Sequence, residues 1–318
     1  MTLTANPEGC FSVGINVDRD HITVVLVDFA GQVRGRATRE IRFPLPEDVS
    51  RFWHDAGARL LAENNLTEAQ LLGIGIALPD DFGKVDIPGR PASFDAWNTT
   101  DPASLFARAG GPPVFLENDA AAAALGELQY GHGMSKPSFF YILIAAGLGG
   151  GLIIDGEHFR GADGRSGEIG FLPIQSDRTS ATSLQAVVSL SALYAHIGAG
   201  GFSVSEPDGL LGLPPEAQAR IDEWIDLAAD VLTAPVVNIS CVVNPEAVYI
   251  GGRLPAAIVE RLTQSLNTRL AAITGVPAIA KVSRAATSAD APAVGAAILP
   301  VIDRLLPSRA TLRKTSRP

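Results

Sequence analysis

The chain has 318 residues, 47% of them hydrophobic and 19% charged, which is typical of a globular protein large enough for two domains. Its formal net charge of -9 gives no positive field for nucleic acid or anionic membranes, and no apolar run reaches the length of a membrane span. Two cysteines far apart in sequence, Cys10 and Cys241, provide neither a disulfide framework nor a zinc cluster, so we expect a cytoplasmic protein.

The first half of the chain is predicted to begin with a three-stranded meander. Two β-prone runs, 11–17 and 22–29, and a third extended run at 32–43 are joined by short polar turns. The elements expected next are a helix at 47–65, a strand at 72–78, a surface excursion at 80–100, a short helix at 102–109, a strand at 113–116 and an alanine-rich helix at 120–130. Strands alternating with helices indicate α/β architecture with largely parallel strands.

The second half repeats this opening. An apolar run at 139–146, a glycine cluster and a second apolar run at 152–154 predict two strands joined by a tight turn, and Asp155-Gly156 turns the chain again. Further helices are expected at 183–196, 216–243, 254–273 and 291–306, with strands at 247–250 and 278–282. Two meanders, each leading into helices and further strands, indicate an internal duplication with a cleft between the copies.

Polar groups and glycines cluster at the predicted strand ends. Asp119, in Glu117-Asn118-Asp119, suits a helix N-cap, and in a cleft it could also act as a general base. Glu168 lies between glycines, either as a ligand for vicinal hydroxyls or in a solvated turn. The cluster Gly147, Gly149, Gly150 and Gly151, like Gly251-Gly252, could let backbone N–H groups approach a phosphate or nucleotide, or could form ordinary turns.

Three segments together resemble one family. They are VFLENDAAAAALGE (114–127), AAGLGGGLIIDGEHFRGADGRSGEIG (145–170) and NPEAVYIGGRL (244–254), and their order and spacing are similar to those of the ROK family of repressors, open reading frames and sugar kinases. The resemblance covers roughly residues 12–300. It implies a duplicated α/β fold of the sugar kinase/Hsp70/actin-like (ribonuclease H-like) type, with sugar and nucleotide in an interdomain cleft. We expect a smaller domain at 11–117 plus about 299–312, a larger one at 118–298, and disordered tails at 1–10 and 313–318.

The resemblance also implies roles for individual residues. Asp119 corresponds to the catalytic base, which takes a proton from a sugar hydroxyl as it attacks the γ-phosphate of Mg-ATP. The residues implied to bind sugar are Asn118, Asp119, Glu168 and Gln185. The residues implied to bind phosphate or nucleotide, if any is bound, are Gly147, Gly149, Gly150, Gly151, Gly251 and Gly252.

The first turn departs from the kinase pattern. Family kinases carry an aspartate at the end of the first strand and Gly-Gly-Thr-Lys in the turn, which cradles ATP phosphates. Here Asn16 replaces the aspartate and the turn is Asp18-Arg19-Asp20-His21. Two carboxylates would repel a polyanion by several kcal/mol, which Arg19 could offset in part. Ala145-Ala146 also replaces the Gly-Thr of the second phosphate motif, so a hydroxyl donor is missing.

The family's zinc site is missing as well. Phe171 stands where the family has a histidine, the stretch 175–184 contains no cysteine, and Gln185 replaces a glutamate that binds sugar. We expect no zinc, and a loop that is either mobile or packed through Phe171. The pocket for the sugar is expected to be shaped by Ser93, Phe94 and Trp97.

Three hypotheses follow. The leading one is a carbohydrate-binding protein similar to the sensor half of ROK regulators, with no certain cofactor. The second is an ATP-dependent hexose or N-acylhexosamine kinase, with Mg-ATP as cofactor and Asp119 as base. The third is a non-catalytic structural or partner-regulating subunit. About ten residues precede the first strand, too few for the winged helix-turn-helix of family repressors, so DNA is not an expected partner of this chain alone. The acidic charge and the lack of a long apolar run speak against a membrane, and a homodimer fits the resemblance.

Overall fold

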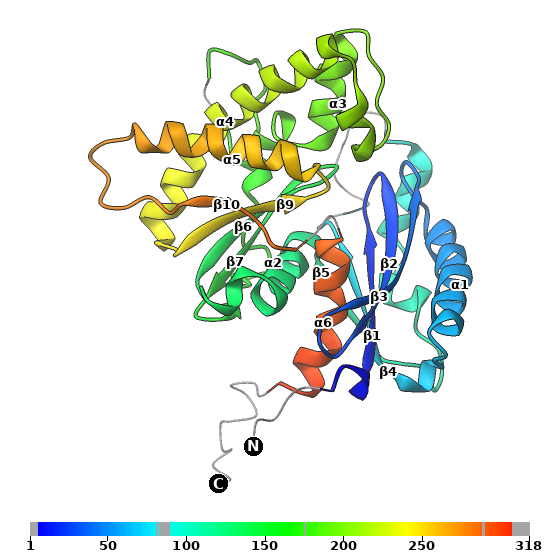
Figure 1. Cartoon of the computed structure of the whole chain (residues 1–318). Coiled ribbons are helices and arrows are strands. Elements are labelled where there is room, and N and C mark those ends of the chain that lie inside the picture. Colours follow the sequence, from blue (N-terminus) through cyan, green and yellow to red (C-terminus); the bar gives the residue numbers. More distant parts are fainter. Residues whose placement is uncertain (1–5, 81, 83–89, 175, 288–289, 307–318) are drawn as a thin grey trace. The chain divides into compact units, whose positions relative to one another are not determined.

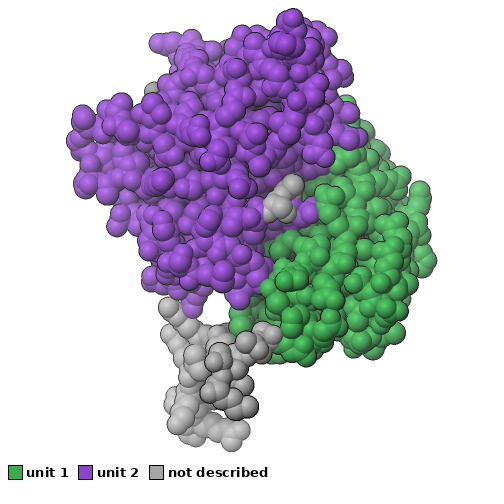
Figure 2. Space-filling view, in the orientation of Figure 1, with its two compact units in different colours: residues 1–119, 293–318 green, residues 120–292 purple. Residues whose placement is uncertain are grey.

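The computed structural model describes residues 6–306 except 81, 83–89, 175 and 288–289 (Figure 1). Contacts within the chain divide it into two compact units, residues 1–119 with 293–318 and residues 120–292 (Figure 2). Each unit is built around a five-stranded sheet of its own. The part of the leader that is described forms a 3-10 turn, η1 (Pro7–Gly9), capped by Asn6.

The sheet of unit 1 has the strand order β3-β2-β1-β4-β5. Its strands are β1 (Phe11–Val17), β2 (His21–Asp28), β3 (Val33–Glu40), β4 (Leu71–Leu78) and β5 (Val114–Asn118). The first three form the predicted antiparallel meander, and β4 and β5 extend it in parallel with β1. Helices α1 (Pro46–Glu63) and α6 (Ala291–Arg304) lie on opposite faces of this sheet (Figure 1), which is why every residue of β1 and β2 is buried.

The sheet of unit 2 repeats the pattern in the order β10-β9-β6-β7-β8. Its strands are β6 (Phe139–Ile144), β7 (Leu148–Ile154), β8 (Glu157–His158), β9 (Ala247–Gly252) and β10 (Val282–Arg284). The antiparallel meander β6–β7–β8 is followed by β9 and β10, which run parallel to β6. The predicted duplication of the meander is therefore confirmed. The helices are α2 (Asp119–Tyr130), α3 (Leu190–Ala199), α4 (Pro215–Val243) and α5 (Ala256–Ala271).

Glycines allow helices to approach each sheet at backbone distance. A Cβ added to Gly14 in β1 would overlap the carbonyl oxygen of Ala293 in α6, and one added to Gly75 in β4 would overlap that of Ala296. In unit 2 a Cβ on Gly151 in β7 would lie 2.6 Å from the Cβ of Ala124 in α2. These contacts leave no room for any side chain, so they fix where the helix crosses the sheet.

A buried carboxylate holds the far end of α2. The side chain of Glu127 is completely buried, and its Oε1 accepts hydrogen bonds from the backbone N–H groups of His132 and Ala286, each at 3.0 Å. Its Oε2 accepts from the backbone N–H and the hydroxyl of Thr287, at 3.0 and 2.9 Å. Four donors satisfy both oxygens, which is what a charge needs in order to be buried.

Several elements differ from the sequence-based prediction. The segment 80–100 is not wholly a surface excursion, because η3 (Ala92–Asn98) buries Phe94 and Trp97 in the core of unit 1, where the indole N–H of Trp97 donates to the carbonyl of Pro44 at 2.8 Å. The helix predicted at 183–196 is instead a 3-10 turn, η7 (Leu184–Ala186), followed by α3, whose N-cap is Ser189. The helix predicted at 102–109 is a 3-10 turn at Pro102–Leu105.

Helix α4 is long and apolar enough to cross a membrane by length and composition, which the sequence analysis did not expect. Half of its most apolar stretch is buried within the protein, and Trp224 and Leu232 lie in the core of unit 2. The core helix of a soluble protein passes the same test. Pro235 lies inside α4 and does not interrupt it.

The backbone approach of α6 to β1 can be tested by substitution. Gly14→Ala should destabilise the protein by about 1–3 kcal/mol, because the new methyl group has no space beside Ala293 and the backbone must shift. Gly198→Ala is the matched control, since that glycine is exposed in α3 with nothing within 4 Å of an added Cβ. Denaturant unfolding measures both. Equal midpoints for Gly14→Ala and the unsubstituted protein would show that the approach is not a constraint.

Candidate functional site

In unit 1 the predicted site residues gather at one edge of the sheet. The parallel strands β1, β4 and β5 are in register, with Asn16 opposite Ala77 and Leu78 opposite Asn118. Their carboxyl ends therefore meet at the same edge, where ligands bind in open α/β sheets. Asn118 ends β5, and Asp119 follows as the first residue of α2, with its side chain buried. The prediction that these residues lie at a strand end and helix start is confirmed.

The β1–β2 turn at this edge is a closed polar network. His21, which is 2% exposed, forms a hydrogen bond through Nδ1 to Oδ1 of Asp20 at 2.6 Å and through Nε2 to Nδ2 of Asn16 at 3.0 Å. With the proton on Nδ1, the ring donates to Asp20 and accepts from the Asn16 amide. Asp18 is 1% exposed.

Two backbone donors of this turn are already engaged. The N–H of Asp18 donates to the carbonyl of His21 at 3.0 Å, and the N–H of Arg19 donates to Oδ1 of Asp18 at 2.7 Å. A phosphate cradle needs such N–H groups pointing toward the ligand. The turn instead holds two carboxylates, so its residues do not fit the phosphates of ATP. A cation among Asp18, Asp20 and His21, whose ligand atoms lie within 4.8 Å of one another, would have to displace the His21–Asp20 hydrogen bond.

In unit 2 the glycine cluster lies mainly within a strand. The tight turn is at Ala145–Gly147, where the N–H of Ala145 donates to the carbonyl of Gly147 at 3.0 Å, whereas 149–151 belong to β7. The expectation that the whole cluster forms the turn was wrong. A Cβ on Gly150 would lie 2.6 Å from the carbonyl oxygen of Gly167 and from the ring of Phe140. Gly150 thus lets a second backbone segment pack on the strand.

That second segment carries Glu168 and lies beside the one that carries Gln185. Gly170 packs so closely on β7 that an added Cβ would overlap the carbonyl oxygen of Leu148, and it would lie 3.4 Å from the Cβ of Gln185. The carboxylate of Glu168 contacts the guanidinium of Arg165, with Oε1 and Nη2 3.4 Å apart. The structure therefore packs the segment of Glu168 on β7 and places the segment of Gln185 beside it.

Gly251 and Gly252 end β9 beside the end of β6. Gly252 pairs with Ile144, and its φ of 115° is one that favours glycine. An added Cβ would overlap the carbonyl oxygen of Ile144 at Gly252 and the hydroxyl of Tyr141 at Gly251. Both glycines are thus required by packing against β6, and a contact with a nucleoside remains a prediction.

The structure places the residues expected around the loop and the pocket. Phe171, which was expected to pack the loop unless the loop is mobile, is 50% exposed. Phe94 and Trp97 are buried among Phe82 and other core residues of unit 1, whereas Ser93 is exposed. The residues at Phe171 and in the described part of 176–184 do not fit zinc, because they include neither histidine nor cysteine.

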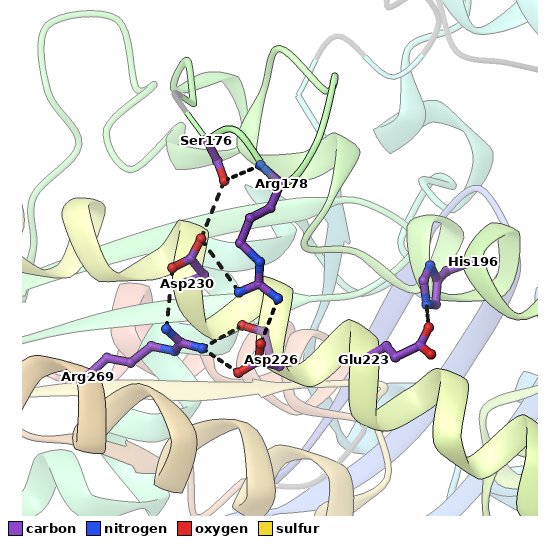
Figure 3. Close-up of polar contacts among 7 residues, drawn as sticks. All are labelled: Ser176, Arg178, His196, Glu223, Asp226, Asp230 and Arg269. Carbon is purple, nitrogen blue, oxygen red and sulfur yellow. Dashed lines mark hydrogen bonds and ion pairs between the residues drawn. The ribbon is translucent and has the colours of Figure 1, made fainter.

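The sequence analysis missed the residues that hold this loop. Arg178 in the loop forms ion pairs with Asp226 and Asp230 of α4, and Arg269 of α5 pairs with the same two aspartates (Figure 3). The spacing of Asp226 and Asp230 could have indicated these ion pairs, because two aspartates four residues apart on a helix repel each other unless cations pair with them.

The sequence matches the model of the ROK family over residues 12–301, and the chain belongs to this family. It is 32% identical to the xylose repressor of Bacillus subtilis over 175 residues, which is 55% of this chain and 45% of the repressor. The chain therefore spans less than half the length of that relative.

Solved structures show the same fold. A ROK family glucokinase from Streptomyces griseus, solved with glucose and AMPPNP, matches with a TM-score of 0.67 and 22% identity, covering 91% of this chain and 98% of that one. A ROK family transcriptional regulator, a homologue of the E. coli MLC protein, matches with a TM-score of 0.68 and 22% identity, covering 93% and 78%. The sugar kinase/actin-like fold is therefore confirmed, and kinase and regulator resemble this chain equally.

His158, at the start of the segment that leads to Glu168, is a half-buried titratable group. It lies in β8 opposite Ile153, and its ring nitrogens have no hydrogen-bond partner among the residues that the structure describes. Burial, and then the charge of Arg160, lower the pKa of His158 to about 4.

This shift predicts an acid-sensitive fold. The unfolded chain binds the proton at the ordinary pKa of about 6.5 and the folded chain only near 4, so stability falls as the pH drops from 6.5 to 4. In His158→Phe the free energy of unfolding should fall by about 1–2 kcal/mol less on acidification than in the unsubstituted protein. This figure allows for the water that still reaches the His158 ring. Thermal unfolding at pH 7 and pH 4.5 measures it. His54→Phe, at an exposed position of α1, is the control. If both variants lose as much stability as the unsubstituted protein, His158 is not responsible.

Proposed function

We propose that this chain is a carbohydrate-binding ROK protein of the regulator or sensor type, without efficient kinase activity. The observation that carries the proposal is the β1–β2 turn, where Asp18 and His21 are buried and the N–H groups of Asp18 and Arg19 are engaged within the turn. A kinase must hold the phosphates of its nucleotide, and a sugar sensor need not. The ligand is a small-molecule sugar, and the setting is the cytoplasm.

In this proposal the sugar hydroxyls bind to carboxylates and amides at the strand ends. Asn118 ends β5 and Asp119 follows it, and Glu168 lies in a segment packed on β7 with the segment of Gln185 beside it. Carboxylates and amides of this kind accept and donate the paired hydrogen bonds that vicinal hydroxyls require. Asp119 would accept a hydrogen bond from the ligand without receiving its proton. DNA is not proposed as a partner of this chain alone, and a homodimer is compatible with the family.

The second candidate is an ATP-dependent kinase for a hexose or an N-acylhexosamine. It is favoured by Asp119, a buried carboxylate at a helix start that suits a general base, and by the likeness to the Streptomyces griseus glucokinase. Gly147, Gly149 and Gly252, at or near the turns beside β6, would then hold phosphate or nucleoside. A third candidate, a structural or partner-regulating subunit, binds neither ligand.

Titration calorimetry separates the three candidates. Hexoses, pentoses and N-acylhexosamines are titrated with and without Mg-ATP, and product formation is assayed in parallel. We expect heat with at least one sugar, none with Mg-ATP alone, and no phosphorylated product. Turnover that Asp119→Asn abolishes would establish the kinase. If no sugar produces heat, the third candidate, a structural or partner-regulating subunit, would remain.

Asp119→Asn should weaken sugar binding by about 10- to 100-fold, since a hydrogen bond to a charged acceptor contributes about 1.5–3 kcal/mol. Asp55→Asn, on the exposed side of α1, makes the same chemical change away from the strand ends and should leave the affinity unchanged. Equal affinities for the two variants would contradict the assignment of Asp119 to the sugar site.

A further inference from the structure

Four charged side chains from three elements form a ring on the surface of unit 2 (Figure 3), called here the Arg178 ring. Nη2 of Arg178 lies 2.7 Å from Oδ2 of Asp226, and its Nη1 lies 3.9 Å from Oδ2 of Asp230. On the other side, Arg269 contacts Asp226 and lies 3.4 Å from Oδ1 of Asp230. Each aspartate therefore lies between two guanidinium groups. The ring joins the loop at 176–182 to α4 and α5.

The ring is more than a set of surface ion pairs. An isolated exposed pair contributes only about 0–1 kcal/mol, but these carboxylates share their partners, and without the arginines the two aspartates would repel each other across one turn of α4. The hydrogen bond from Arg178, and with it that from Arg269, lowers the pKa of Asp226. Ser176 adds a contact, with Oγ 3.4 Å from Oδ2 of Asp230.

The loop that carries Arg178 is the tip of a short hairpin. The N–H of Ile174 donates to the carbonyl of Thr182 at 3.3 Å, and the N–H of Leu184 donates to that of Leu172 at 2.9 Å. Gln185 is the residue directly after this hairpin. Helix α4 also supports the base of the hairpin, because the indole N–H of Trp224 donates to the carbonyl of Val187 at 2.8 Å.

We propose that Arg178 is a positioning residue for the sugar site. Through the ring it fixes the hairpin at 172–184 on α4, and the hairpin in turn holds Gln185 beside the segment of Glu168. This inference rests on the proposed sugar binding. Arg178 does not itself contact the sugar: it sets the place of Gln185, and screening of its ion pairs by salt weakens that hold.

The first test measures the hairpin directly and does not depend on any ligand. Hydrogen exchange at the amides of Ile174 and Leu184 should become about tenfold faster in Arg178→Gln, whereas Arg178→Lys, which keeps the charge, should recover part of the protection. Arg261→Gln is the matched control, because Arg261 joins α5 to Asp222 of α4 without touching the hairpin. Unchanged exchange in Arg178→Gln would overturn the proposal.

The second test measures sugar affinity by calorimetry at about 0.05 M and about 1 M NaCl, where exposed charges are weakly and strongly screened. Arg178→Gln should bind about three- to tenfold more weakly at low salt and lose the salt dependence that the unsubstituted protein and Arg261→Gln show. Faster exchange with unchanged affinity would overturn the positioning role. An unsubstituted protein that binds no sugar would overturn the proposed function and with it this role, whereas the exchange result would still show whether the ring holds the hairpin.

Discussion

Each unit depends on contact between the backbone of its sheet and the backbone of a crossing helix. Gly14 and Gly75 admit α6 in unit 1, and Gly151 admits α2 in unit 2. Any side chain at these positions would push the helix away, and the strands would lose the cover that buries them. The same constraint explains Gly150, which lets the segment of Glu168 lie directly on β7. Glycines that resemble a phosphate loop in sequence therefore also serve the packing of the site.

The sequence predicted those parts of the fold that local pattern determines. Both meanders and the long helices α1, α4 and α5 were correct within a few residues, because hydrophobic periodicity over such lengths has one simple solution. Prediction from the sequence failed where contacts between residues far apart in the chain determine the local structure. Phe94 and Trp97 belong to a Gly- and Pro-rich stretch, and contacts with Phe43, Phe82 and the carbonyl of Pro44 make that stretch part of the core. The sequence alone does not distinguish a turn from a strand for a glycine run between apolar residues, because the segment that packs against the run decides between them.

For the candidate site, the sequence motifs identified the correct strand ends. They did not show which polar groups at those ends are already hydrogen-bonded. Two acids in the β1–β2 turn predict repulsion of phosphate, yet they do not reveal that the N–H groups of Asp18 and Arg19 are already engaged. The Arg178 ring was missed because its members are scattered over a hairpin and two helices, and only the spacing of Asp226 and Asp230 indicated it. The residues of the proposed sugar site are therefore held by hydrogen bonds and ion pairs that the sequence motifs do not reveal.

The network around His21 has a consequence for protein engineering. Replacing Asp18 and Asp20 by glycine would release the N–H of Arg19, but it would also remove the acceptor of the His21 Nδ1–H, and that ring is buried in β2. A buried donor without an acceptor costs about 1–3 kcal/mol. His21 and its other partner, Asn16, would have to be exchanged together with the turn. The smallest graft that could introduce a kinase-type phosphate turn is therefore the whole strand–turn–strand piece, because exchange of the turn alone would leave the buried His21 ring without its acceptor.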